Sequence, residues 1–202
     1  KVKVVPEAVD GDTFYPNEKV SLPEYEDNRF KFIIFGRWDF RKSTKELIES
    51  FLQEFDKDEP VDLILSIDNL YANDGLKTTE ERLEHYKLMD PRIKVKHFPT
   101  REEYIKYLQK GHVFLSCARS GEYSTYSQSE MPGNFYVPDY EHLKETMRDA
   151  YENYDYHKKQ ALEESVLLRN KFTWKNAAQI AYNEVEDLMV NIPKNKIEIS
   201  FD

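Results

Sequence analysis

The chain has 202 residues, of which 40% are hydrophobic and 14% aromatic, so it is long and apolar enough for one sizeable folded domain and not a disordered chain. The excess of 38 acidic over 29 basic residues gives a formal net charge of −9, which excludes a general nucleic-acid binder. Cys117 is the single cysteine, which excludes an intrachain disulfide and a thiolate zinc cluster and favours a reducing compartment.

Strand-like and helix-like patterns alternate along most of the chain. A short strand, Val2–Val5, is closed by Pro6. A continuous apolar run then predicts a strand buried on both faces at Phe32–Phe35. A second buried strand is predicted at Val61–Ile67, and further strands at Ile93–Phe98 and His112–Cys117. Predicted helices follow these strands, with caps at Ser43 or Thr44, at Thr78 or Thr79, and at Thr100, whose spacing to Glu103 matches a capping box. Beyond Pro138 the pattern is wholly helical, at Tyr140–Tyr151, 156–171 and 173–190.

The alternation of strands and helices predicts a parallel sheet. The expected fold class is α/β, a Rossmann-like doubly wound parallel sheet with helices on both faces and a helical C-terminal part. Residues 1–195 are assigned to one domain, and residues 196–202 to a tail or the start of a downstream segment. In open sheets of this kind, ligands bind beyond the carboxyl ends of the strands, which selects the loops after Phe35, Ile67, Phe98 and Cys117.

The first of these loops reads FGRWDFRKST from Phe35. Gly36 allows a tight turn, and Arg37 and Lys42 flank the entry to a helix whose N–H groups favour an anion. Arginine forks onto two phosphate oxygens, while lysine supplies a point charge. Two interpretations stay open: a phosphate site, or solvated surface cations no different from Arg41.

The last of these loops, CARSGEYSTYSQSEMPG from Cys117, holds Glu122 and Glu130, separated by seven residues. Carboxylates at the carboxyl end of a strand bind sugar or ribose hydroxyls, or stabilise a developing positive charge. An ordinary polar loop has the same composition, so this alternative stays open as well.

Several other residues are interpreted as structural. His97 and His112 lie at or beside strands, and Asp68 and Asn69 are typical of turns. One set of aromatic residues is interpreted as packing between the C-terminal helices and not as a stacking platform: Tyr151, Tyr154, Tyr156, Phe172 and Trp174. The two Asp-x-Asp stretches, Asp10–Asp12 and Asp56–Asp58, lie outside the four loops after Phe35, Ile67, Phe98 and Cys117, so no divalent metal is predicted.

Five blocks of the sequence, in order, resemble the C-terminal half of family 4 glycosyltransferases, enzymes of the GT-B fold. VVPEAVDGDTFYP from Val4 resembles the entry to that half, and FIIFGRWDFRKST from Phe32 resembles its strand and Gly-Arg-x4-Lys phosphate loop. The next block, HFPTREEYIKYLQKGHVFLSCARSGE from His97, is similar to the family stretch that ends in its acidic motif. VPDYEHLKETMRDAYEN and RNKFTWKNAA match the closing helices.

The resemblance implies a binding site for a nucleotide-sugar donor. In it, Gly36, Arg37 and Lys42 form the loop that binds the donor diphosphate. Pro99 and Thr100 lie in the loop that touches the nucleotide base, largely through backbone. Arg37 and Lys42 are also implied catalytic residues, because they neutralise charge on the departing diphosphate.

Glu122 is implied as a third catalytic residue. It matches the first Glu of the family's E-x7-E motif, which lies close to the donor sugar, and Glu130 has the spacing of the second, which holds the ribose. The stretch Gly121–Pro132 is shorter than its counterpart in the family. We expect that residues are missing from it, in which case Glu130 loses its match. The alternative is a true deletion that damages the donor site.

The resemblance implies the donor-binding half of a nucleotide-sugar-dependent retaining glycosyltransferase. Its partners would be the donor, a glycan, lipid or protein acceptor, and an N-terminal GT-B domain that this chain lacks; no cofactor, metal or nucleic acid is implied. The fragment alone should bind donor and transfer nothing. Without an apolar run near ~18 residues or a signal peptide, a cytoplasmic location is expected, with peripheral membrane attachment through the absent domain as a further option.

Two alternatives differ from this function. One is a non-catalytic GT-B-like interaction or scaffold domain, which would keep the fold and lose the site. The other is a sugar-nucleotide epimerase, against which the Gly-Arg-x4-Lys loop argues. Titration with nucleoside diphosphates separates the donor-binding domain from the scaffold.

Overall fold

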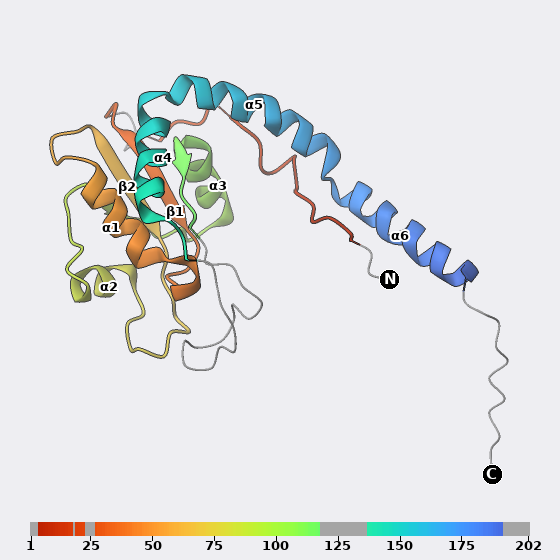
Figure 1. Cartoon of the computed structure of the whole chain (residues 1–202), viewed down its shortest axis with the longest axis horizontal. Coiled ribbons are helices and arrows are strands. Elements are labelled where there is room, and N and C mark those ends of the chain that lie inside the picture. The colour runs from red at the N-terminus through yellow and green to blue at the C-terminus, as the bar shows by residue number, and fades with distance from the viewer. Residues whose placement is uncertain (1–3, 18, 23–26, 118–136, 192–202) are drawn as a thin grey trace, which may run out of the picture. The chain divides into compact units, whose positions relative to one another are not determined.

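The computed structural model describes residues 4–17, 19–22, 27–117 and 137–191 (Figure 1). The predictions for Glu122, Glu130, the stretch Gly121–Pro132 and the tail 196–202 lie outside the described residues. The chain divides into two compact units: the sheet unit, residues 17–158, and the terminal unit, residues 1–16 with 159–202. The assignment of residues 1–195 to one domain stays a prediction.

The sheet unit is built on four parallel strands, as the alternating pattern predicts. They are β1 (Phe30–Phe35), β2 (Val61–Ser66), β3 (Ile93–Val95) and β4 (Val113–Phe114), in the order β3-β2-β1-β4. The two central strands are the two continuous apolar runs, and they are buried because helices cover both sheet faces.

The two edge strands are shorter than predicted. The backbone N–H of Lys96 still donates to Leu65 O at 2.8 Å, but three residues later Pro99 has no N–H to donate. The predicted strand Val2–Val5 is also wrong for its described part. Val4 and Val5 belong to no strand and are exposed, so their apolar side chains have no sheet face to pack against.

The second and third helices begin at their predicted caps, whereas Ser43, before the first helix, makes no capping hydrogen bond through its side chain. A 3-10 turn, η2 (Phe40–Lys42), leads into the first helix, and Thr78 forms a full capping box with Glu81 at the second. Thr100 Oγ1 accepts the backbone N–H of Glu103 at 3.2 Å. The helices are α1 (Thr44–Glu54), α2 (Thr79–His85), α3 (Arg101–Lys110), α4 (Tyr140–Glu152), α5 (Tyr154–Lys171) and α6 (Trp174–Asn191).

Alternating residues of β1 divide the core between the two faces of the sheet. Phe32 and its neighbours on one face pack against α1 and α4, which lie side by side there (Figure 1). Ile33 and Phe35 face the other way and pack against Tyr107 of α3. Helices therefore cover both faces, which confirms the doubly wound α/β class.

A buried cluster of charged residues lies at the amino-terminal edge of the sheet, where the sequence pattern indicates only apolar strands. Lys31 is 1% exposed and Asp62 is 2% exposed. The Lys31 ammonium donates to Arg29 O at 2.8 Å, pairs with Asp27 and lies 3.7 Å from Asp62, whose other oxygen accepts Arg29 Nε at 2.9 Å. Each buried charge thus has an opposite partner, which offsets its desolvation.

Arg148 fastens α4 to the rest of the sheet unit. Its guanidinium donates to Glu54 Oε1 at 2.8 Å and to Glu54 O at 2.7 Å, pairs with Glu59, and lies 4.5 Å from the centre of the Phe55 ring. Met147 is buried in the core beside it. For α4, the prediction that the C-terminal helices pack back onto the sheet layers is therefore confirmed; for α6 it stays a prediction.

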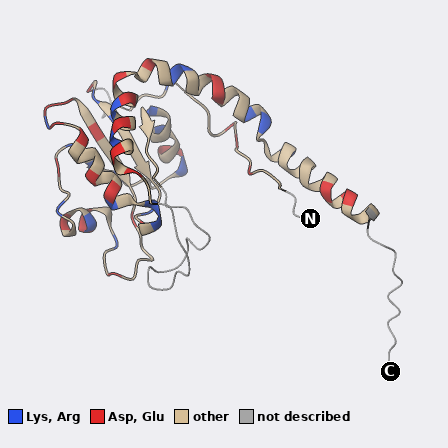
Figure 2. Ribbon diagram, in the orientation of Figure 1, with Lys and Arg blue, Asp and Glu red and all other residues tan. Residues whose placement is uncertain are grey.

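The terminal unit joins the amino-terminal segment to the end of α5 and to α6. The Val9 N–H donates to Phe172 O at 2.8 Å, which holds the amino-terminal segment against the junction of the two helices. Figure 2 shows charged residues of both signs along α5 and mostly uncharged positions on α6. Ile180, Val185 and Leu188 of α6 are all exposed, as an apolar strip on this helix predicts.

Candidate functional site

The loop from β1 to α1 carries the strongest sequence motif, and its geometry depends on Gly36. This residue has φ +136°, which side chains rarely adopt, and a Cβ there would lie 3.0 Å from Lys42 Nζ. The Lys42 ammonium therefore lies over Gly36, the residue that precedes Arg37 in the chain. Both cations belong to one short loop at the carboxyl end of β1.

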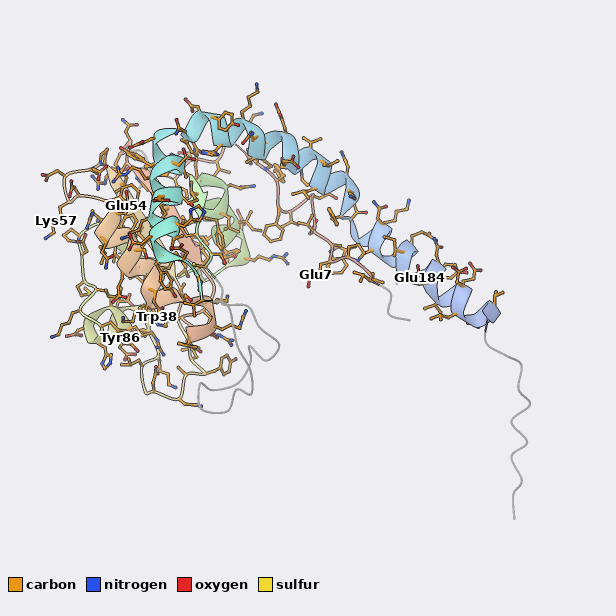
Figure 3. The ribbon with its side chains drawn as sticks, viewed as in Figure 1. Glu7, Trp38, Glu54, Lys57, Tyr86 and Glu184 are labelled. Atoms are coloured by element: carbon orange, nitrogen blue, oxygen red, sulfur yellow. The ribbon has the colours of Figure 1, made fainter. Side chains whose placement is uncertain are left out.

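Contacts to the end of β2 fix this loop. Gly36 N donates to Ser66 O at 2.9 Å, and Trp38 N donates to Ile67 O at 2.7 Å. The Asn69 amide donates to Trp38 O at 2.9 Å. The Trp38 indole is buried and stacks on Tyr86, with 5.7 Å between ring centres and 11° between planes (Figure 3). The loop is thus held by backbone, amide and aromatic contacts before any ligand arrives.

The start of α1 leaves its positive end without a cap from its own N-cap residue. Ser43 has φ 49° and makes no side-chain capping hydrogen bond to the helix. Asp39 instead accepts Arg41 N at 2.8 Å and, through its other oxygen, an N–H of Arg37 at 3.4 Å. Arg37, Arg41 and Lys42 carry three positive charges against this single carboxylate, so the loop favours an anion.

The loop after β3 lies at the same edge of the sheet. The Phe98 ring lies 5.0 Å from the Phe35 ring at the end of β1, which places Pro99 and Thr100 on this side of the sheet. Both residues are exposed. The Thr100 hydroxyl donates to Glu103 Oε2 at 3.1 Å as it caps α3, so its side chain is engaged in capping.

His97 bridges two carboxylates at this edge. Its ring nitrogens lie 3.3 Å from Asp68 Oδ2 and 3.2 Å from Glu80 Oε1. The second Asp68 oxygen accepts both N–H and O–H of Thr79 at 2.7 Å, which anchors the start of α2. These contacts support the structural interpretation of His97 and Asp68.

His112 lies at the opposite, amino-terminal edge. The ring stacks on Phe30 with 4.6 Å between ring centres, and Nδ1 accepts the backbone N–H of Lys31 at 3.0 Å. Burial, with the positive charge of Lys31 as a smaller cause, lowers the pKa of His112 to about 4. A neutral, half-buried imidazole here supports the sheet and lies away from the loop of Arg37, in agreement with its structural interpretation.

The aromatic residues that were predicted to pack the C-terminal helices fall into two groups. Tyr151 and Tyr154 pack edge-on against Phe30, as expected, and Phe172 is half-buried. Tyr156 and Trp174 are exposed, so the packing interpretation is wrong for these two. Trp174 lies in the first turn of α6, and nothing in the sequence around it indicates that its ring is exposed.

The site residues suggested by the sequence are therefore only partly brought together. Gly36, Arg37 and Lys42 share one loop, and Pro99 and Thr100 lie at the same sheet edge. Among the described residues, no group of three or more His, Cys, Asp or Glu side chains is placed to hold a metal ion. None of the helices in the described ranges meets the requirements for a bilayer span. The loop chemistry, concentrated positive charge beside a helix start, suits an oxyanion ligand.

The sheet order, the parallel pairing and the two helical layers define a Rossmann-like α/β domain. Similar solved structures include sucrose-phosphate synthase from Thermosynechococcus elongatus, with a TM-score of 0.64 and 15% identity, where the match covers 93% of this chain and 53% of that one. They also include the C-terminal domain of a glycosyl transferase group 1 family protein from Francisella tularensis, with a TM-score of 0.53, 15% identity, and 88% and 98% covered.

These two structures resemble the chain in fold and share little of its sequence. The chain spans about half the length of the sucrose-phosphate synthase chain. At 15% identity the likeness shows the fold, which is that of glycosyltransferase domains. No protein-family model matches the sequence, and no curated protein matches it.

Proposed function

We propose that this chain is the donor-binding part of a nucleotide-sugar-dependent retaining glycosyltransferase of the GT-B fold. The observation that carries the proposal is the loop from β1 to α1, where Lys42 Nζ lies over Gly36 beside Arg37, at a helix start that Ser43 does not cap. A nucleoside diphosphate is the leaving group whose charge such a loop would neutralise.

Different residues at this edge of the sheet would bind different parts of the donor. Arg37 would fork onto the diphosphate oxygens and Lys42 would add a point charge, so that both stabilise the developing negative charge as the sugar departs. Backbone groups of Pro99 and Thr100 would contact the base. Glu122 would approach the donor sugar and Glu130 the ribose; both assignments rest on the sequence resemblance.

The acceptor, a glycan, lipid or protein, would be bound by an N-terminal GT-B domain. The exposed strip on α6, which comprises Ile180, Val185 and Leu188, supports docking of that domain, because burial of apolar side chains drives association. The donor is a substrate, and the proposal involves no cofactor.

The test is calorimetric titration of the chain with UDP, GDP and ADP. We expect Arg37→Ala to weaken the binding of the preferred nucleotide by about 2 kcal/mol, or about 30-fold, since a charge-assisted hydrogen bond is lost. Lys57→Ala is the matched control, because it removes one exposed cation just before β2, at the other edge of the sheet (Figure 3). Equal affinity in wild type and Arg37→Ala would contradict the proposed role.

A second candidate function, a non-catalytic scaffold domain, is favoured by one observation. Asp39 lies 3.4 Å from the Arg37 guanidinium and so competes with any incoming phosphate for that cation. In a scaffold, none of the three nucleotides would bind, and Asp39→Asn would not create binding. In the donor-binding domain, Asp39→Asn should strengthen nucleotide binding, because it removes the competing charge.

A further inference from the structure

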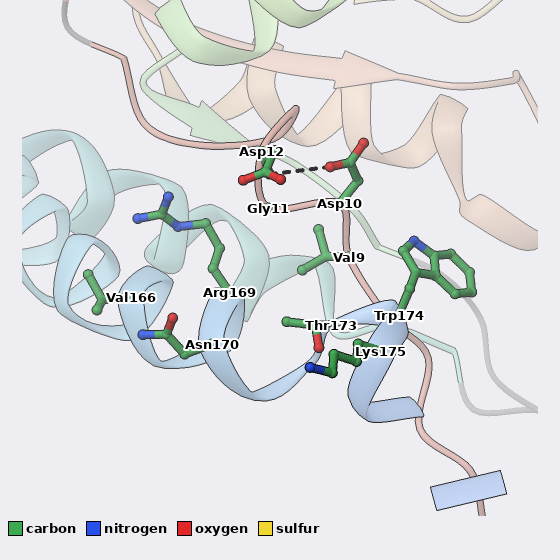
Figure 4. Close-up of a pocket in the computed structure, with 10 residues that line it drawn as sticks. All are labelled: Val9, Asp10, Gly11, Asp12, Val166, Arg169, Asn170, Thr173, Trp174 and Lys175. Atoms are coloured by element: carbon green, nitrogen blue, oxygen red, sulfur yellow. Dashed lines mark hydrogen bonds between the residues drawn. The ribbon is translucent and has the colours of Figure 1, made fainter. Parts of the chain in front are cut away.

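A cavity of about 400 Å³ lies within the terminal unit, between the amino-terminal loop and the junction of α5 with α6 (Figure 4). This volume falls in the range of roughly 300–1,000 Å³ that is typical of small-molecule sites. No residue of the proposed donor site lines it. Its function is therefore a separate question from nucleotide binding.

The loop on one side of the cavity is held in a fixed shape. Asp10 Oδ1 accepts the backbone N–H groups of Asp12 and Thr13, both at 3.2 Å, and Asp10 Oδ2 accepts the Thr13 hydroxyl. Gly11 lets the loop lie close to α5, since a Cβ there would be 3.2 Å from Arg169 Cβ. The wall is thus formed without a ligand, which lowers the entropic cost of binding.

The charges that line the cavity balance one another. Asp10 and Asp12 carry two negative charges, and Arg169 and Lys175 carry two positive charges. Because the charges of this lining cancel in sum, a ligand of a single sign gains no net electrostatic attraction from it. This balance favours a neutral ligand over a phosphate or an amine.

The polar groups of the lining are available for hydrogen bonds of both directions. Among the described residues, the Asp12 carboxylate, the Asn170 side-chain amide and the Lys175 ammonium have no hydrogen-bond or ion-pair partner. Together they offer acceptors, donors and one group that does both. A ligand with several hydroxyl groups, each a donor and an acceptor, matches this set.

An exposed indole completes the lining. Trp174 is 68% exposed and lies on the side of the cavity opposite Arg169 in the view of Figure 4. A large aromatic face left in water is available for apolar contact. The ring of a pyranose presents C–H groups on one face and hydroxyls around its edge, so it can stack on an indole while its edge forms hydrogen bonds.

We propose that this cavity binds a neutral saccharide, with a C–H face against the Trp174 indole and hydroxyls bonded to Asp12, Asn170 and Lys175. The site is independent of the proposed nucleotide site. The proposal rests on three features of the lining: its balanced charges, its polar side chains without a partner among the described residues, and the exposed Trp174 ring. A nucleotide-sugar donor fits this lining less well than a neutral saccharide, because the donor carries a charged diphosphate.

Tryptophan fluorescence of the whole chain tests the proposal, because the two tryptophans differ in access. Trp38 is 5% exposed, so iodide should quench mainly Trp174. Cellobiose, maltose and lactose serve as probes at millimolar concentrations, with sorbitol as the control for viscosity. We expect at least one disaccharide to protect Trp174 from iodide in a saturable manner, and sorbitol to have no such effect.

Variants locate the binding. Trp174→Ala and Asp12→Asn should each weaken binding at least tenfold, measured for both by nuclear magnetic resonance titration of backbone amides. Tyr182→Ala is the matched control, since this exposed aromatic residue lies on α6 outside the cavity. All three variants should keep the wild-type affinity for nucleoside diphosphates, so a failure of one proposal is distinct from a failure of the other.

Three results would overturn the saccharide site. The first is an absence of saturable protection with all three disaccharides. The second is equal protection by sorbitol, which would mean a bulk solvent effect. The third is much tighter binding of glucose 6-phosphate than of the neutral sugars, which would make the cavity an anion site.

Discussion

Replacement of His112 by asparagine should flatten the dependence of stability on pH. In the wild-type protein, His112 Nδ1 accepts the Lys31 backbone N–H at 3.0 Å, which requires an unprotonated nitrogen. Protonation would break this bond and place a cation near Lys31, Lys110 and Lys158, whose charges also lower the pKa of His112. Asparagine can present its Oδ1 to the same N–H but does not titrate.

The size of the effect follows from the difference between the two pKa values. The pKa is 6.5 for an ordinary histidine and about 4 for His112 in the folded chain. The unfolded chain therefore binds a proton first, and stability is fully present above about pH 7 and is lost as the pH falls toward the folded pKa. Between about pH 7.5 and about pH 5 the loss is roughly 2 kcal/mol at most, and about 1 kcal/mol once solvent screening is included.

Urea unfolding at both pH values measures this loss. Wild type should lose about 1 kcal/mol more than His112→Asn between the two conditions, with unchanged m-values. His142→Asn, on the exposed surface of α4, is the control and should follow wild type. If His112→Asn loses as much stability as wild type, the imidazole does not titrate as its contacts require, and the reasoning is refuted.

Two further predictions concern the sheet unit. Gly36→Ala should destabilise the fold by about 1–2 kcal/mol in urea unfolding and weaken nucleotide binding, because φ +136° suits only glycine and the new Cβ would displace Lys42. Arg148→Ala should cost about 2–3 kcal/mol by the same assay, against less than about 0.5 kcal/mol for Lys57→Ala, which removes an exposed cation. The hydrogen bond from Arg148 lowers the pKa of Glu59, so the stability that Arg148 contributes should be present at neutral pH and should fall as Glu59 protonates in acid. If Arg148→Ala lost the same free energy of unfolding at neutral and at acid pH, this prediction would be contradicted.

The central strands and the position of the cationic loop could be predicted because their signals are local. Continuous apolar runs mark β1 and β2, and the order of strands and helices sets the parallel topology. Once β1 ends at Phe35, Gly36 and Arg37 must lie at its carboxyl end. Thr100 caps α3 by accepting the backbone N–H of Glu103, the residue three positions away that the sequence indicates.

The bracing of the loop could not be predicted, because its partners are distant in the sequence. Asn69 reads as a turn residue, yet its amide supports Trp38 from 31 positions away. Asp39 looks like one more polar loop residue, although it both shapes η2 and competes for Arg37. The ends of the edge strands β3 and β4 could not be predicted either, because each of these strands pairs with a neighbour on one side only and the sequence does not mark where that pairing stops.

The start of β1 shows the same limit at a buried position. Lys31 interrupts the apolar run, so the sequence places the first strand residue at Phe32, whereas β1 begins at Phe30. A lysine is tolerated inside a covered strand only with an acidic partner, and that partner, Asp62, lies on another strand.

The pair Lys31 and Asp62 also has a consequence for how the strands find their alignment. The two residues occupy directly paired positions of β1 and β2. The remaining residues of both strands are nearly all apolar, so neighbouring alignments would bury similar hydrophobic area. A shift by one residue would set Lys31 against Val61 or Leu63 and turn Asp62 away from Lys31 and Arg29, which would leave a buried carboxylate without an opposite charge at a cost of several kcal/mol. We infer that this charged pair selects one register of β1 against β2, which their apolar residues alone would not specify.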